Sequence, residues 1–225
     1  MRDALIYGGG RLGRQVYALV RRYLADRVRV LGFIDDVQPP GAAVIDGLAT
    51  VGGLEAAGSG HLDPSRAALF LAIGYADMAA RGRAFLRAKG LSYEFLTLVH
   101  PQAVVEPDAI LGEGCVVLAG TVLDQRVEAG AACYFDIGVR VGEYSTLDFN
   151  NYLAAGCVAG GSVRMGRDNF FGLNATLVND ISVGDGNFVN AASLLHRDLG
   201  SGQQYIEVRQ ARSMSRRPAG GGSGS

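Results

Sequence analysis

Hydrophobic residues in the second half of the chain recur at every sixth position. From Val105 to Leu195, the sixteen positions spaced six apart read V, L, V, L, A, F, V, L, L, A, M, F, L, V, V and L. The residue four places after each of the first fifteen is compact, and glycine often follows the apolar residue directly. Neither a helix nor a simple alternating strand has period six. A coil with three short strands per turn does, so the pattern predicts a parallel β-helix of hexapeptide repeats.

Three hexads per turn predict that residues eighteen positions apart stack on one another. Cys115, Cys133, Asn151, Asn169 and Asn187 have this spacing, so we expect them to form one inward-facing column. The cysteines are interpreted as small buried residues rather than nucleophiles. The asparagines are interpreted as a structural amide ladder of the kind that stacked strands favour.

The first 98 residues follow a different pattern. ALIYGGG, VRVLGFIDD and AALFLAIG are typical of buried strands, whereas RLGRQVYALVRRYLA and DMAARGRAFLRAKG have helical spacing. This alternation predicts a small parallel sheet with helices on its faces, a Rossmann-like α/β domain. We therefore expect an α/β domain over residues 1–98, a β-helix over 99–198, and a C-terminal segment over 199–225 that ends in a disordered Gly/Ser-rich tail.

Composition narrows the class of protein. The chain of 225 residues is 48% hydrophobic and carries a formal net charge of -1, which gives no electrostatic footprint for nucleic acid or an anionic membrane. We expect no signal peptide and no membrane span, because no apolar run is long enough. Three cysteines without CxxC spacing argue against a disulfide framework and against a metal site. The sequence thus indicates a cytoplasmic protein.

A glycine-rich loop, GGGRLG, follows the first predicted strand and opens the first predicted helix. Exposed backbone N–H groups at a helix start suit a phosphate. Two carboxylates, Asp35 and Asp36, end the second predicted strand. The loop also fits GxGxxG, the dinucleotide fingerprint. Three interpretations stay open from the residues alone: a nucleotide-sugar site, an NAD site, and a turn that only packs helix on strand.

The hexapeptide repeat, led in by VHPQAVV and preceded by GFIDD, resembles the sugar O-acyltransferase / sialic acid O-acetyltransferase-like family. This family includes acetyl-CoA-dependent N-acetyltransferases of UDP-linked 4-amino sugars. The resemblance runs from Ala4 to about Arg212, where IEVRQAR stands in place of the family's closing VVGNPAR. It implies a left-handed β-helix, a homotrimer with active sites between neighbouring β-helices, and a role in cell-surface polysaccharide biosynthesis.

The same resemblance implies an acyl-CoA-dependent acyltransferase that modifies an amino or hydroxyl group of a nucleotide-linked sugar, with acetyl-CoA as the expected donor. The glycine loop and GFIDD then hold the nucleotide-sugar. The residues expected at this site are Gly8, Gly9, Gly10, Arg11, Asp35, Asp36 and Gly74. Arg81 or Arg83, in the following helix, is a further candidate to reach a diphosphate.

The family's catalytic base is a histidine at the third place of a hexad, where register alignment finds Glu143. A second family histidine aligns with Tyr152. By this alignment Glu143 and Tyr152 are the expected catalytic residues, and Gly160, Gly161 and Asn179 the expected coenzyme contacts. The chain's three histidines all lie outside the catalytic register.

Because the histidine is replaced, two alternatives remain. Glu143 is either a general base or a solvated surface carboxylate. In the second case the protein is an inactive relative that binds a nucleotide-sugar or serves as a trimeric scaffold. For the trimer, we expect Val117, Leu118 and the tyrosines at 134, 144 and 152 to supply apolar interface area.

Overall fold

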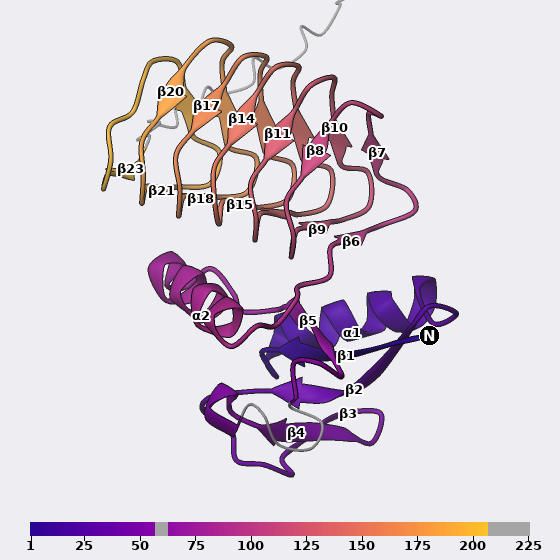
Figure 1. Cartoon of the computed structure of the whole chain (residues 1–225). Helices are drawn as coiled ribbons and strands as arrows, with labels where there is room; N and C mark the ends of the chain where they lie inside the picture. The colour runs from indigo at the N-terminus through magenta and orange to yellow at the C-terminus, as the bar shows by residue number, and fades with distance from the viewer. Residues whose placement is uncertain (57–62, 207–225) are drawn as a thin grey trace, which may run out of the picture.

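The computed structural model describes residues 1–56 and 63–206 of the chain. An α/β part at the N-terminus packs beneath a long β-helix (Figure 1). The Gly/Ser-rich tail, which is predicted to be disordered, lies outside the described residues. So does the IEVRQAR motif after Ile206. Within the described part, no helix is long and apolar enough to cross a membrane.

The N-terminal part is a five-stranded sheet with the order β3-β4-β2-β1-β5 and two helices. Its elements in chain order are β1 (Arg2–Tyr7), α1 (Arg11–Tyr23), β2 (Val28–Ile34), β3 (Ala43–Ile45), β4 (Leu48–Gly52), the 3-10 turn η1 (Leu54–Ala56), β5 (Ala68–Leu71) and α2 (Met78–Gly90). Strands β1, β2 and β5 pair in parallel, as the sequence predicts. The alternating pattern is thus confirmed for these three strands and both helices.

Strands β3 and β4 were not predicted, and they make the sheet mixed. They form an antiparallel hairpin around Asp46 and Gly47, whose φ angles are 49° and 79°. Two consecutive positive φ angles are typical of the tight hairpin turn for which Asp-Gly is a preferred pair. The dipeptide between AVI and LATVG was therefore a usable signal for this hairpin.

The β-helix consists of two-residue strands separated by tight corners. Its three faces contain seven, six and five parallel strands. The first face holds β6 (Leu98–Val99), β9 (Val116–Val117), β12 (Tyr134–Phe135), β15 (Tyr152–Leu153), β18 (Phe170–Phe171), β21 (Phe188–Val189) and β23 (Gln204–Tyr205). The second holds β7 (Val104–Val105), β10 (Val122–Leu123), β13 (Arg140–Val141), β16 (Val158–Ala159), β19 (Thr176–Leu177) and β22 (Leu194–Leu195). The third holds β8 (Ile110–Leu111), β11 (Glu128–Ala129), β14 (Thr146–Leu147), β17 (Arg164–Met165) and β20 (Ser182–Val183).

Strands eighteen residues apart pair in register, for example Val141 with Ala159, which confirms three hexads per turn. The coil is the predicted left-handed β-helix. It extends one strand beyond the predicted repeat at each end, with β6 before it and β23 after it.

From Gly114 onward, each corner contains one residue in the left-handed backbone region. From Gly114 to Ala192, the positive φ angles recur at every sixth residue, and non-glycine residues such as Asn150 (60°) and Ser162 (58°) hold most of these positions. The glycines that follow the apolar position have another cause. A Cβ on Gly112 would lie 2.5 Å from the backbone nitrogen of Ala131, so the stacked corners leave no room for a side chain there.

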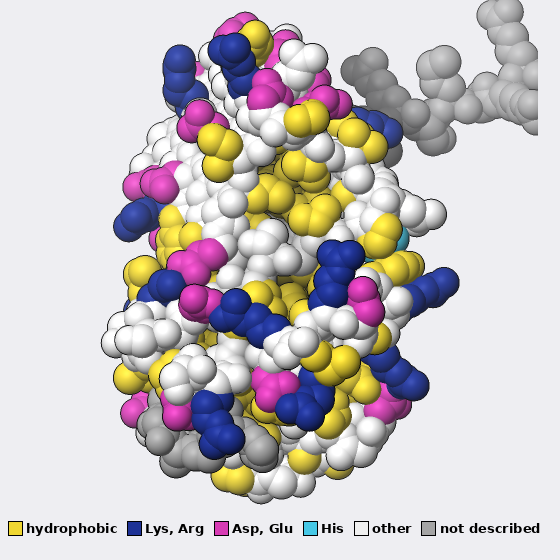
Figure 2. All heavy atoms as spheres, turned by 45° about the vertical axis from the view of Figure 1, so that its right-hand side comes forward, with side chains coloured by type: hydrophobic (Ala, Val, Ile, Leu, Met, Phe, Trp, Pro, Cys, Tyr) yellow, Lys and Arg dark blue, Asp and Glu magenta, His cyan; other side chains and the backbone are white. Residues whose placement is uncertain are grey.

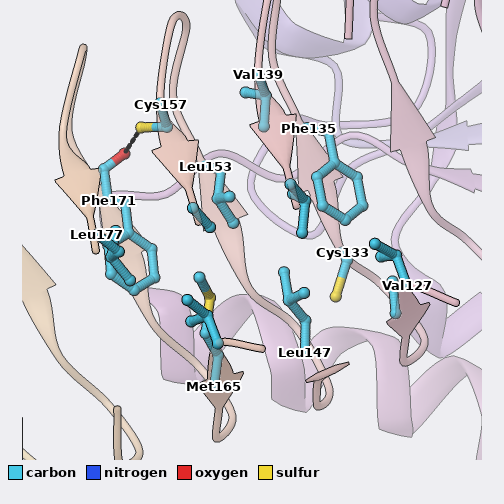
Figure 3. Close-up of a cluster of buried hydrophobic side chains, with 14 of the residues drawn as sticks. Val127, Cys133, Phe135, Val139, Leu147, Leu153, Cys157, Met165, Phe171 and Leu177 are labelled. Atoms are coloured by element: carbon cyan, nitrogen blue, oxygen red, sulfur yellow. Dashed lines mark hydrogen bonds between the residues drawn. The ribbon is translucent and has the colours of Figure 1, made fainter. Parts of the chain in front are cut away.

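The predicted inward column is confirmed. Cys115, Cys133, Asn151, Asn169 and Asn187 are all buried, and the large residues of each hexad fill the rest of the core (Figure 3). Asn169 donates from Nδ2 to Oδ1 of Asn151 at 2.9 Å, and Asn187 donates to Oδ1 of Asn169 at 3.0 Å. The asparagines are therefore a structural ladder.

The face that starts with β6 is covered by the N-terminal part of the same chain. Tyr134, Tyr152 and Phe170 project outward from it and pack in one cluster with side chains of β1, α1 and α2. Val117 and Leu118 are also buried within the chain. The expectation that these residues form a subunit interface is therefore wrong, except for Tyr144, which is 55% exposed.

Candidate functional site

A crevice of about 530 Å³ opens at the carboxyl ends of β1, β2 and β5. In sheets of this kind, ligands bind outside the carboxyl ends of the strands. The residues that line it are Tyr7, Gly8, Gly10, Asp35, Asp36, Val37, Ala72, Ile73, Gly74, Ala80, Arg83, Ala84 and Arg87. Five of the seven expected nucleotide-sugar residues thus come together, whereas Gly9 and Arg11 lie beside the crevice rather than in its lining.

Part of the glycine loop is already engaged within the protein. The N–H of Gly8 donates to Ile34 O at 2.8 Å, and the N–H of Gly9 donates to Asp35 Oδ2 at 2.9 Å. The start of α1 is different, because its N-cap, Gly10, supplies no side-chain hydrogen bond. The first N–H groups of α1 therefore remain available to an anion in the crevice.

Asp35 joins the loop to the end of β2. Its carboxylate accepts the N–H groups of Gly9, Val37 and Gln38. Burial by itself would raise the pKa of Asp35, but these three backbone donors together hold it below the usual value. Asp35 is therefore ionised at neutral pH and shapes the wall of the crevice.

Asp36 lies at the centre of a polar network on the crevice floor. Its Oδ2 accepts from the Tyr7 hydroxyl at 2.5 Å and lies 3.5 Å from Arg87 Nη1. Arg87 also pairs with Glu55. Burial and the neighbouring Asp36 carboxylate raise the pKa of Tyr7 far above its usual value, so its hydroxyl stays protonated as a donor.

The two arginine candidates have different surroundings. Arg83 lines the crevice, with its side chain 66% exposed and its nearest acidic partner, Asp77, at 3.9 Å. Arg81 is fully buried at the junction with the β-helix and does not reach the crevice as a free cation. Sequence reasoning did not single out Tyr7 or Arg87, although Arg87 stands one helical turn after Arg83.

Glu143 lies at the corner between β13 and β14, where its exposed side chain extends over the next turn. A Cβ on Gly161 would meet the Glu143 carboxylate, with Oε1 at 2.6 Å. Asn179 occupies the turn after that, and its side chain covers Gly160. Glu143, Gly161 and Asn179 are eighteen residues apart and stack along one edge of the β-helix, with Gly160 beside them.

Tyr152 is not part of this patch. It projects from the face that the N-terminal part covers, and it is 5% exposed. Its ring stacks on Tyr134 with a centroid distance of 4.4 Å and lies 5.1 Å from the ring of Tyr75. Burial is the main cause of the raised pKa of its hydroxyl. Within one chain, the structure does not bring Tyr152 together with Glu143.

Every residue that lines the crevice belongs to the N-terminal part, so one chain also does not bring the crevice and Glu143 into a single cavity. Across residues 1–56 and 63–206 there is no cluster of three side chains that could hold a metal ion.

Comparison with known proteins gives the class. No family model matches the chain. Among solved structures, the acetyltransferase domain of PglB from Neisseria gonorrhoeae superposes with a TM-score of 0.79 at 24% identity, covering 90% of this chain and 95% of that one. WeeI from Acinetobacter baumannii gives a TM-score of 0.77 at 18% identity, covering 89% of this chain and 94% of that one. These two similarities concern the fold.

A histidine mutant of perosamine N-acetyltransferase from Caulobacter crescentus, in complex with CoA and GDP-perosamine, gives a TM-score of 0.77 at 26% identity. The match covers 89% of this chain and 90% of that one. The fold and the repeat thus define a hexapeptide-repeat acyltransferase, which confirms the class of enzyme predicted from the sequence. Within that class, the chain resembles the sugar acetyltransferases.

Proposed function

We propose that the protein transfers an acetyl group from acetyl-CoA to the amino group of a nucleotide-linked sugar. The observation that carries this proposal is the crevice at the carboxyl ends of the sheet, in a chain that superposes along most of its length on an enzyme bound to CoA and GDP-perosamine. The cytoplasmic location inferred from the sequence stays a prediction.

The crevice would hold the nucleotide diphosphate. The uncapped start of α1 supplies backbone donors, and Arg83 supplies a positive charge that is not committed to a close partner. The Tyr7 hydroxyl proton is donated to Asp36, so the Tyr7 oxygen and the Asp36 carboxylate both offer acceptors for the nucleoside. In this arrangement Gly8, Gly10 and Gly74 keep the walls open, and Asp35 and Gly9 hold the loop in shape.

Glu143 is the proposed base. Gly161 and Asn179 are the residues proposed to contact the thioester of acetyl-CoA. The sugar amine attacks the thioester carbonyl carbon, the carbon–sulfur bond breaks, and CoA leaves as the thiolate. Glu143 takes the proton that the nitrogen loses and returns it to the departing sulfur, so CoA is released as the thiol. An amine is the proposed acceptor, since the chain superposes on a perosamine N-acetyltransferase.

A homotrimer would bring the two halves of the site together, and the face that holds β7, β10 and β13 is the proposed contact. The face covered by the N-terminal part is not available, and the β8 face carries Glu128, Thr146 and Arg164 on its surface. The β7 face is the more apolar. Its outward side chains are Val104, Val122, Arg140, Val158, Thr176 and Leu194.

Hydrophobic side chains gather over the β-helix in Figure 2. Apolar area of this kind marks interfaces. Light scattering tests the trimer. A monomer at micromolar concentration would contradict it and would leave the crevice and Glu143 apart.

Thiol release from acetyl-CoA tests the activity. The purified protein is incubated with acetyl-CoA and a panel of UDP-, dTDP- and GDP-linked amino sugars, each paired with the corresponding hydroxyl sugar. We expect release with at least one amino sugar and with none of the hydroxyl sugars. No release across the panel from a folded protein would overturn the proposal.

The exposed Glu143 at the place of the family histidine favours one second candidate, an inactive relative that binds a nucleotide-sugar or serves as a scaffold. Thermal unfolding separates the two. Stabilisation by both a nucleotide-sugar and CoA supports the enzyme, because each ligand stabilises the folded state that binds it. Stabilisation by the nucleotide-sugar alone supports the inactive relative.

A further inference from the structure

Arg81 joins the crevice to the β-helix. It is fully buried where α2 meets the β-helix. Its Nε donates to Ile73 O at 3.0 Å, and its Nη1 donates to Ala132 O at 2.6 Å and to Asn150 Oδ1. Ile73 lines the crevice, whereas Ala132 and Asn150 are corner residues of successive turns of the β-helix. One side chain therefore connects the crevice wall with two turns of the other part of the chain.

Asn150 extends this connection. It is buried in the left-handed conformation, and its Nδ2 donates to Met78 O at 2.7 Å and to Asp168 Oδ1 at 2.6 Å. Met78 is the first residue of α2, and Asp168 stands at the same corner one turn further along. Arg81 and Asn150 thus hold the start of α2 against three successive corners.

The chemistry of this contact is unusual for a packing residue. The Arg81 charge is buried against carbonyl and amide oxygens, and among the described residues its Nη2 has no hydrogen-bond partner. Burial also lowers the pKa of Arg81. An apolar side chain would fill such a place at a lower cost in desolvation. What the guanidinium adds is a rigid fork of donors that fixes the distance and the angle between the groups it contacts.

We propose that Arg81 is a positioning residue for acetyl transfer. It fixes the Ile73–Gly74 wall, and with it a nucleotide-sugar bound in the crevice, at a set orientation to the β-helix. In a symmetric assembly this also sets the crevice relative to the neighbouring copies. The inference rests on the proposed function, because it requires a sugar held in the crevice to be acetylated at a corner of a β-helix.

A kinetic experiment separates positioning from general stability. Arg81→Met is compared with Arg164→Met, a matched change of an exposed arginine on the β8 face. Both are assayed with a nucleotide-linked amino sugar and, at high concentration, with free glucosamine, which the crevice does not orient. We expect kcat for the nucleotide-linked sugar to fall by about 10²-fold in Arg81→Met, the usual result of a displacement near 1 Å.

Binding of UDP, GDP and CoA should change by less than about 3-fold in Arg81→Met, and any rate with glucosamine should be unchanged, since these depend on one part of the chain at a time. An unchanged kcat for the nucleotide-linked sugar would overturn the inference. So would an equal loss of rate with both acceptors, or weakened binding of every ligand.

A second measurement does not depend on turnover, and a second variant covers the case in which Arg81→Met does not fold. Asn150→Gly keeps the left-handed backbone and removes the side chain that Arg81 contacts. We expect amide hydrogen exchange over residues 73–82 to quicken in both variants and not in Arg164→Met. The double variant should be no worse than the poorer single variant, because both changes break one network.

The outcomes distinguish the inference from the proposed function. If amide exchange over residues 73–82 is unchanged in both variants while the wild-type protein acetylates its substrate, the positioning role alone is overturned. Faster exchange in a protein that shows no acetyl transfer at all would overturn the proposed function, and the positioning role with it.

Discussion

Replacing Gly161 by alanine would displace the proposed base without removing it. An added Cβ would lie 2.6 Å from Glu143 Oε1 and 2.8 Å from Cδ, whereas ordinary contacts begin at 3.4 Å. The carboxylate must therefore withdraw by about 0.8 Å, the difference between 3.4 and 2.6 Å. Gly161 does not have a positive φ, and the atoms met belong to the end of a flexible side chain, so the fold should tolerate the change.

A misplacement near 1 Å at a reacting centre costs about 10²-fold in rate. We expect kcat for acetyl transfer in Gly161→Ala to fall by about 30- to 100-fold, with the melting temperature nearly unchanged. The assay is thiol release from acetyl-CoA at saturating concentrations of both substrates, and circular dichroism gives the melting curve.

Two other glycines serve as controls. Gly160→Ala would place its Cβ 2.8 Å from the backbone nitrogen of Asn179, and it should destabilise the β-helix. Gly90→Ala meets nothing within 4 Å and should be silent in both assays. If Gly161→Ala keeps full activity at full stability, the position of the Glu143 carboxylate does not matter, and the reasoning that makes it the base is wrong.

Three further predictions concern the crevice and the core. Arg83→Gln should weaken binding of a nucleoside diphosphate by about 10-fold, because it removes one charge-assisted hydrogen bond, and should leave binding of the nucleoside unchanged. Calorimetry measures both affinities, and equal losses for the two ligands would contradict this prediction. Asn169→Ala removes three side-chain hydrogen bonds of the ladder and should cost about 3 kcal/mol in the free energy of unfolding, against almost nothing for the partly exposed Asn190→Ala. The lowered pKa of Asp35 means that its contribution to stability is present above its unfolded pKa and is lost as pH falls through the folded value. The melting temperature of Asp35→Asn should therefore lie below that of wild type at pH 7, and the difference should shrink on acidification towards pH 3; a constant difference would refute this assignment.

The β-helix could be predicted from the sequence because every hexad packs in the same way against its neighbours, so the pattern of large inward residues is local and periodic. One large inward residue per hexad is a requirement of the fold itself, so Val105 and Leu195 belong to one uninterrupted register. The asparagine ladder followed from the same count. The hairpin at Asp46 and Gly47 was missed because its strands are short, although the turn residues marked it.

The outward face of the repeat could not be predicted in the same way. Tyr134 and Tyr152 have the composition of an interface, and the sequence does not say which partner covers them. The N-terminal part of the same chain packs over both tyrosines, and this contact joins segments that are far apart in sequence. The burial of Arg81 and the exposure of Arg83 have the same origin, since both depend on how α2 packs against the β-helix.

The central claim is that Glu143 accepts the proton during acetyl transfer, and the kcat of Glu143→Gln tests it most directly. Glutamine keeps the size of the side chain and removes the proton acceptor. We expect kcat to fall by about 10²- to 10⁴-fold, the usual effect of general-base catalysis. CoA affinity should stay the same because the exposed carboxylate contributes little to binding. A Glu143→Gln variant that acetylates its substrate as fast as wild type would contradict the account, because the proton would then have to leave by another route.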